Sequence, residues 1–286
     1  MSDTFDTEGR RRSALSRRRL LATTGTLAIG GFAGCSGDGD QNGTGGDTDG
    51  TPSPGTDTPT PDPCASPTTL DPSAVESGGT ISAGCYRVPK TLTVETGTLT
   101  VEPGVVLQFA NDVGLHVESD GRLAVKGTAE QPVRFTGTER TRGFWKGISF
   151  RNSNSADNVL ERAIVEYAGS SAWNPNYDPA GLFLRGDNVR LSVRQSTVRG
   201  NATMGLTATQ AGAQLDFEGV LFEENEAPLY LPANHLRGLG ADTAFANNDA
   251  SYVALGEPSG AARTTVTQSA EWPALGAPYR ARHNVH

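Results

Sequence analysis

The feature that most constrains the fold is a series of short apolar segments that starts near Gly79 and continues along the rest of the chain. In residues 91–94, 105–109 and 122–125, apolar and polar side chains alternate. Alternation with a period of two residues is typical of half-buried strands. Turn-forming Pro, Gly and Asp residues lie between the segments, and no long stretch follows the 3.6-residue period of a helix. The sequence therefore predicts an all-β fold.

The spacing of these segments favours a solenoid. They recur about every 20 to 25 residues, a period typical of repeat architectures, at 107–109, 133–135, 148–150, 164–165, 182–184, 191–193, 205–207, 215–217, 229–231 and 253–255. One coil cannot cover its own apolar side, so neighbouring coils must stack. A β-sandwich is the structural alternative, but it usually spans about 100 residues, and this run is about twice as long. We predict a right-handed parallel β-helix (solenoid) over residues 64–286.

Five motifs carry a resemblance to a known family: LTVEPGV at 99–105, GRLAVKG at 121–127, QPVRFT at 131–136, WKGISF at 145–150 and VEYAG at 165–169. They resemble secreted and surface proteins with right-handed parallel β-helix repeats, members of the pectate-lyase-like superfold. The resemblance covers roughly residues 82–279 and implies the fold and a structural role for Trp145. It implies little about activity, because one superfold hosts many functions.

Catalytic motifs known from this superfold are not found in the sequence. The resemblance implies that lyases use a carboxylate cluster for calcium with an arginine or lysine base, and that hydrolases use paired aspartates beside Gly-His-Gly and Arg-Ile-Lys. The acidic residues after Gly186 are scattered, and the four histidines lack metal-ligand spacing. His116 is expected on the outer face of a strand. We predict no catalytic residue, no metal site and no cofactor.

Residues 1–34 have the layout of an export signal. Basic residues at 10–12 and 17–19 precede a weakly apolar stretch at 20–32, which is shorter than the roughly 20 apolar residues that cross a bilayer. SRRRLL, with Arg17 and Arg18, resembles a twin-arginine motif, whose pathway exports folded proteins, and FAGC resembles a lipobox that ends at Cys35. These motifs predict a lipid on Cys35 that anchors the protein to the outer face of the cell membrane. The alternative is a disordered basic tail with a chance cysteine.

Residues 35–63 are almost entirely Gly, Asp, Thr, Pro, Ser, Asn and Gln. Such a segment cannot bury enough apolar area to fold, which predicts a disordered tether. The formal net charge of the chain is −8, so no basic face for a nucleic-acid partner is expected. The excess of arginine over lysine and the acidic tether resemble the composition of haloarchaeal proteins.

The other two cysteines, Cys64 and Cys85, form an even pair outside the cell. We predict a disulfide that closes a loop of about 20 residues; the alternative, two free thiols, is less favoured in an oxidising compartment. Asn201 and Asn42 begin Asn-x-Thr sequons, the first in an expected exposed turn and the second in the tether. Both are therefore candidates for N-glycosylation.

A long loop at 170–179 interrupts the repeat and is the candidate glycan-binding segment. It contains Trp173, Asn174, Tyr177 and Asp178, side chains suited to stacking on a sugar and to hydrogen bonding. The alternative is that the loop folds back and covers the solenoid. Residues 272–279 resemble the entry to a β-helix module. Two alternatives stay open: a second module begins at about 272, or the last strand caps the first module.

Two functions stay open at this point. The first is a membrane-anchored surface scaffold or glycan-binding module, with environmental or surface polysaccharide as its partner. The second is a lyase or glycoside hydrolase acting on acidic polysaccharide. Acidic and basic side chains that converge on one face of the solenoid would favour the second function.

Overall fold

The structure is a computed structural model that describes residues 64–256, 263–264, 266, 269, 271–282 and 284–285. The predicted export signal with Arg17 and Arg18, the lipid site Cys35, the sequon at Asn42 and the tether lie outside the described residues.

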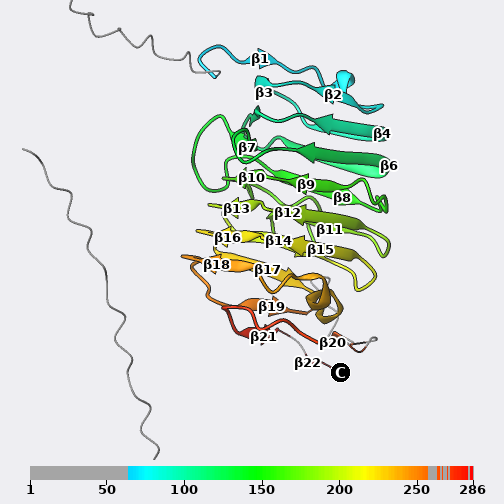
Figure 1. Cartoon of the computed structure of the whole chain (residues 1–286), viewed down its shortest axis with the longest axis vertical. Helices are drawn as coiled ribbons and strands as arrows, with labels where there is room; N and C mark the ends of the chain where they lie inside the picture. Colours follow the sequence, from blue (N-terminus) through cyan, green and yellow to red (C-terminus); the bar gives the residue numbers. More distant parts are fainter. Residues whose placement is uncertain are drawn as a thin grey trace, which may run out of the picture. The chain divides into compact units, whose positions relative to one another are not determined.

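From Cys64 onward the chain winds as a parallel β-helix, as predicted (Figure 1). Every strand pairing in the described part of the chain is parallel. Successive strands along the chain join three faces in turn. The first face is an 8-stranded sheet of β1 (Thr68–Thr69), β3 (Gly84–Val88), β5 (Val105–Phe109), β7 (Val133–Gly137), β10 (Ala163–Glu166), β13 (Thr197–Arg199), β16 (Leu221–Glu223) and β18 (Ala244–Ala246).

The second and third faces belong to one 12-stranded sheet, because the long strands β4 (Leu92–Val101) and β6 (Gly114–Lys126) run through both. The amino-terminal half of β6 pairs with β8 and its carboxyl-terminal half pairs with β9. The second face continues through β8 (Gly147–Arg151), β11 (Ala180–Arg185), β14 (Met204–Ala208), β17 (Ala227–Leu231), β19 (Val253–Leu255) and β21 (Tyr279–Ala281). The third face contains β2 (Gly79–Ile81), β9 (Val159–Glu161), β12 (Arg190–Arg194) and β15 (Gln214–Glu218).

The remaining elements are short. Two 3₁₀ turns, η1 (Pro72–Ala74) and η2 (Ala233–Gly238), interrupt the strands. β20 (Arg263–Thr264) pairs with β22 (Asn284–Val285). β21 pairs with β19 and so adds a rung to the second face. The described part of the predicted second module therefore continues the same solenoid.

The core consists of apolar columns that run from coil to coil. Because β-strand residues alternate between faces, every second residue points inward and meets its equivalent in the next coil. On the first face the register aligns Leu107, Phe135, Val165, Val198 and Phe222, each at most 1% exposed. Trp145 is also fully buried and stacks on Phe109 at 4.3 Å, in agreement with its predicted structural role. Burial of one such side chain contributes about 1.5–3 kcal/mol.

Cys64 and Cys85 are joined by a disulfide in the structure, with their Cα atoms 5.0 Å apart and a sequence separation of 21. Cys85 lies in β3, and the intervening segment supplies β1, which pairs with β3. The bond therefore holds the first residues of the folded part against the first complete coil.

We predict that reduction of this disulfide lowers the free energy of unfolding by about 3 kcal/mol, because the unfolded chain regains the entropy of the open loop. The melting temperature should fall by roughly 6–12 °C. Thiol labelling of the folded, unreduced protein checks the bond directly. Labelling of both cysteines without reduction would contradict it.

Candidate functional site

The predicted glycan-binding loop folds back onto the second face. The indole of Trp173 is half-buried and stacks on the His116 ring, with 5.1 Å between the ring centroids. The Lys146 ammonium lies 5.0 Å from the centroid of the indole. His116 lies on the outer face of β6, as expected. Its neighbour Gly114 leaves the space that the indole needs, since a Cβ atom there would lie 2.5 Å from Cζ2 of Trp173.

The other loop residues also make internal contacts. Tyr177 packs against Phe183 at 5.6 Å between centroids. Asn174 accepts hydrogen bonds inside the loop, at its side-chain oxygen from the Asn176 N–H and at its carbonyl from the Tyr177 N–H. Asp178 forms an ion pair with Arg282 at 3.7 Å. Trp173, Tyr177 and Asp178 therefore tie the loop to the solenoid, while Asn174 stabilises a turn within the loop.

A small hollow of about 100 Å³ lies beside Trp173. Sites for small organic ligands usually have about 300–1,000 Å³, so this hollow is too small for a sugar chain. The loop instead covers an apolar cluster on the outer side of the second face, formed by Ala180, Phe183, Met204, Ala227, Tyr230 and Ala254. These contacts favour the alternative interpretation of the loop as a cover.

We expect Trp173→Ala to destabilise the protein and to leave glycan binding unchanged. The loss should be about 2–3 kcal/mol, below the 3–5 kcal/mol of a fully buried tryptophan, and should lower the melting temperature by roughly 5–10 °C. Trp272→Ala is the control, because Trp272 is 38% exposed, and its effect should be smaller. Weaker glycan binding at an unchanged melting temperature would assign the ring to the ligand.

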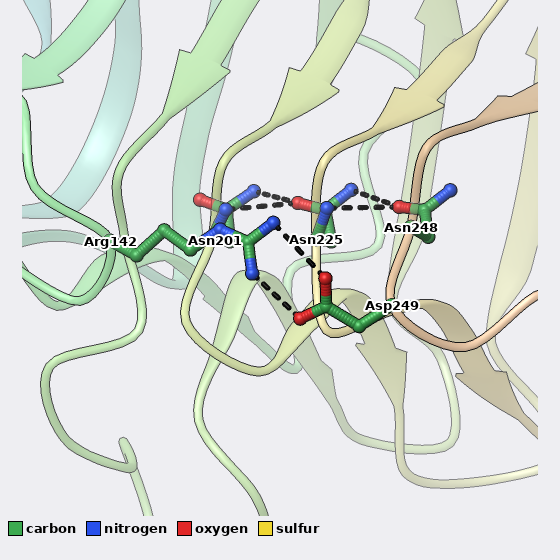
Figure 2. Close-up of polar contacts among 5 residues, drawn as sticks. All are labelled: Arg142, Asn201, Asn225, Asn248 and Asp249. Atoms are coloured by element: carbon green, nitrogen blue, oxygen red, sulfur yellow. Dashed lines mark hydrogen bonds and ion pairs between the residues drawn. The ribbon is translucent and has the colours of Figure 1, made fainter.

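Asn201 is not an exposed glycosylation site, and the prediction for it is wrong. Its side chain is fully buried, and its Nδ2 donates to Oδ1 of Asn225 at 2.7 Å. Asn225 donates in turn to Oδ1 of Asn248 at 3.0 Å, while Asn201 accepts from the Ala168 N–H at 2.8 Å. Figure 2 shows this ladder, with Arg142 paired to Asp249 beside it. The amide nitrogen that a glycan would modify is therefore occupied in the folded chain.

The first face carries a charged cluster that is fully paired. Glu166 is 1% exposed and accepts from Arg134 at 2.7 Å and from Arg199 at 2.9 Å. Burial raises the pKa of Glu166, but the bonds from the two arginines outweigh it and leave the pKa below its usual value. Arg199 also lies 3.6 Å from Glu223. Because each carboxylate has an arginine partner, we assign the cluster to structure.

The candidate binding site is a groove of about 610 Å³ on the outer side of the third face. Its floor is formed by side chains that β-strand alternation directs outward from β9, β12 and β15. Ser192 of β12 lies in register with Val159 of β9 and with Asp216 of β15, and Arg190 lies beside Gln214. Its wall is η2, which follows β17 in the place where the next third-face strand would lie. Leu239, just after η2, forms a single bridge with Phe217 of β15.

Charge in the groove is mainly positive, although the chain from Cys64 onward has 18 basic and 23 acidic residues and so a formal charge of −5. Arg190, Arg194 and Arg237 line it, with Asp216 as the one acidic lining residue. Arg194 is paired with Asp216 at 3.2 Å. Within the described part of the chain, Arg190 and Arg237 form no ion pair. The groove thus presents two unpaired cations.

His235 gives the groove a fixed hydrogen-bond acceptor. Its Nε2 lies 2.7 Å from the Gln210 carbonyl oxygen, which only accepts, so Nε2 carries the proton and Nδ1 carries the lone pair. Burial lowers the pKa of His235 to about 4, because the interior disfavours the charged ring. The ring is therefore neutral at physiological pH.

The sequence did not lead us to predict this groove, although its floor could have been predicted from the repeats. Alternate, outward positions in or directly beside the predicted strands at 191–193 and 215–217 carry Arg190, Ser192, Arg194, Gln214 and Asp216, and alignment of the repeats would have placed them side by side. The η2 wall gives no such signal, since a 3₁₀ turn that replaces a strand does not follow the repeat.

Comparison of the chain with protein-family models, with curated proteins and with solved structures returned no match. Among the described residues, no group of three or more His, Cys, Asp or Glu side chains is arranged to hold a metal ion. No helix in that part of the chain is long and apolar enough to span a bilayer. The function is therefore argued from the groove itself.

Proposed function

We propose that the protein is a membrane-anchored, extracellular glycan-binding module and that its groove binds acidic polysaccharide. The observation that carries the proposal is the convergence of arginine, amide, hydroxyl and imidazole groups on one groove of about 610 Å³. Arginine donors suit the carboxylate of an acidic sugar. Gln214 and Ser192 suit its hydroxyl groups, and a rigid solenoid holds these side chains in place.

Binding without catalysis fits the chemistry of His235. A general base works best when its pKa lies near the working pH, and a ring with a pKa of about 4 is a weak proton acceptor at neutral pH. Nδ1 is better suited to accept a hydrogen bond from a sugar hydroxyl. Asp216, the acidic lining residue, is engaged by Arg194 and by the Ser192 hydroxyl at 3.2 Å.

The proposed location rests on the sequence. The twin-arginine and lipobox motifs would place a lipid on Cys35 after export of the folded protein, and the segment up to residue 63 would act as a spacer between membrane and solenoid. The haloarchaeal composition fits a surface protein of that group. A binding module held away from the membrane would meet surface or environmental polysaccharide.

We expect Ala156→Trp to abolish glycan binding. Ala156 is exposed and lines the groove, so an indole there would fill the space. Ala129→Trp, at an exposed position that is not among the groove residues, is the matched control and should bind as the wild type does. A glycan array followed by titration of the strongest acidic ligand measures both variants. Equal binding by the two, or no glycan bound by the wild type, would refute the proposal.

Product analysis of the same acidic polysaccharides tests the alternative function. We expect no unsaturated sugars and no new reducing ends after incubation with the protein, with or without calcium. Either product, lost in Ala156→Trp and kept in Ala129→Trp, would make the groove the active site of a lyase or a hydrolase.

The anchor has its own test. Cys35→Ser should move the protein from the detergent phase to the aqueous phase, and Arg17→Lys combined with Arg18→Lys should block export, because lipobox and twin-arginine signals depend on these residues. Mass analysis of the amino-terminal peptide checks for the lipid. A wild-type protein that partitions into the aqueous phase without lipid would contradict the anchor.

A further inference from the structure

A second feature, the small hollow beside Trp173, lies on the second face and is separate from the groove. Side chains from three neighbouring strands line it: His116 from β6, Ser149 and Arg151 from β8, and Phe183 and Arg185 from β11. The register places His116 beside Ser149 and Ser149 beside Phe183. Trp173 closes the hollow from the covering loop. None of these side chains lines the groove.

Positive charge gathers around the hollow. Arg151 and Arg185 are direct neighbours on adjacent strands, an arrangement of like charges that destabilises a sheet unless it is compensated. Glu118 compensates Arg151, with a distance of 2.9 Å between Oε2 and Nε. Arg185 has no ion pair within the described residues, and Lys146 lies over the Trp173 ring. The surroundings therefore carry an excess of positive charge.

Two residues that line the hollow each have a buried polar atom without a partner. Nδ1 of His116 and Nε1 of Trp173 are buried and have no hydrogen-bond partner among the described residues. Nε2 of His116 lies 2.9 Å from Oε1 of Glu118, which orients the ring. Buried polar groups are rarely left unpaired, and each exception requires an explanation such as an ion in the site. Because Nε2 donates to the Glu118 carboxylate, Nδ1 of His116 carries a lone pair and gives an anion no hydrogen bond. The indole N–H of Trp173 can only donate, which suits an acceptor-rich ligand.

We propose that this hollow is a binding site for a compact oxoanion, held mainly by Arg185 and Arg151. Its volume of about 100 Å³ would hold about three water molecules at 30 Å³ each, which also suits a tetrahedral anion such as sulfate or phosphate. Arginine binds such oxygens with paired N–H donors. The bound anion neutralises the Arg151–Arg185 pair and strengthens the attachment of the covering loop.

Titration of the folded protein with sodium sulfate and with inorganic phosphate, at constant ionic strength, tests this site. The indole N–H resonance of Trp173 is the readout, and that of the fully buried Trp145 is the internal reference. We expect a saturable shift for Trp173 and none for Trp145. Glucuronate in a parallel titration distinguishes a free anion from the acidic group of a sugar, and a response to glucuronate alone would overturn the proposal of an inorganic anion.

Two variants at Arg185 complete the test. Arg185→Gln should weaken binding at least tenfold, while Arg185→Lys keeps the charge but loses the paired N–H donors and should have an affinity between those of Arg185→Gln and the wild type. Arg140→Gln, on an exposed segment, removes the same charge elsewhere and should have no effect. Circular dichroism verifies that each variant is folded. The absence of a saturable Trp173 shift, or equal affinity in Arg185→Gln and Arg140→Gln, would refute the site.

Discussion

The structure depends on the burial of apolar side chains between neighbouring coils. One coil has an apolar inner side and no means of covering it alone, so each coil is stable only when the next one stacks on it. The column from Leu107 to Phe222 on the first face shows how this works, since each member packs against its equivalent one coil away. Parallel pairing and the asparagine ladder follow from the same stacking, because equivalent residues come to lie side by side.

Departures from the repeat create the features that can bind ligands. A regular solenoid presents flat faces, whereas η2 replaces a strand and forms the wall of the groove on the third face. On the second face, by contrast, the loop at 170–179 covers an apolar cluster and leaves only a small hollow. The same rigid scaffold therefore offers one large groove and one small hollow.

The sequence predicted the fold because alternation and recurrence are direct consequences of strand geometry and stacking. It did not predict the groove, since the position of η2 depends on tertiary packing that has no local signal. For the loop at 170–179, the sequence suggested a binding site that the structure does not favour. Trp173 and Tyr177 are residue types that suit a sugar, but their rings pack on His116 and Phe183. Asn201 fits a sequon, yet Asn201, Asn225 and Asn248 recur with the repeat, a spacing that already indicates a buried ladder. Gly181 leaves the space that the ladder needs, since a Cβ atom there would lie 2.8 Å from the Asn201 amide nitrogen.

The central claim is that the groove on the third face binds acidic glycan. A crystal structure of the folded domain with a bound acidic oligosaccharide tests it most directly. We predict electron density for the sugar between β12, β15 and η2, with a carboxylate within hydrogen-bonding distance of Arg190 or Arg237. Density for the sugar at the Trp173 loop, with an empty groove, would contradict the account.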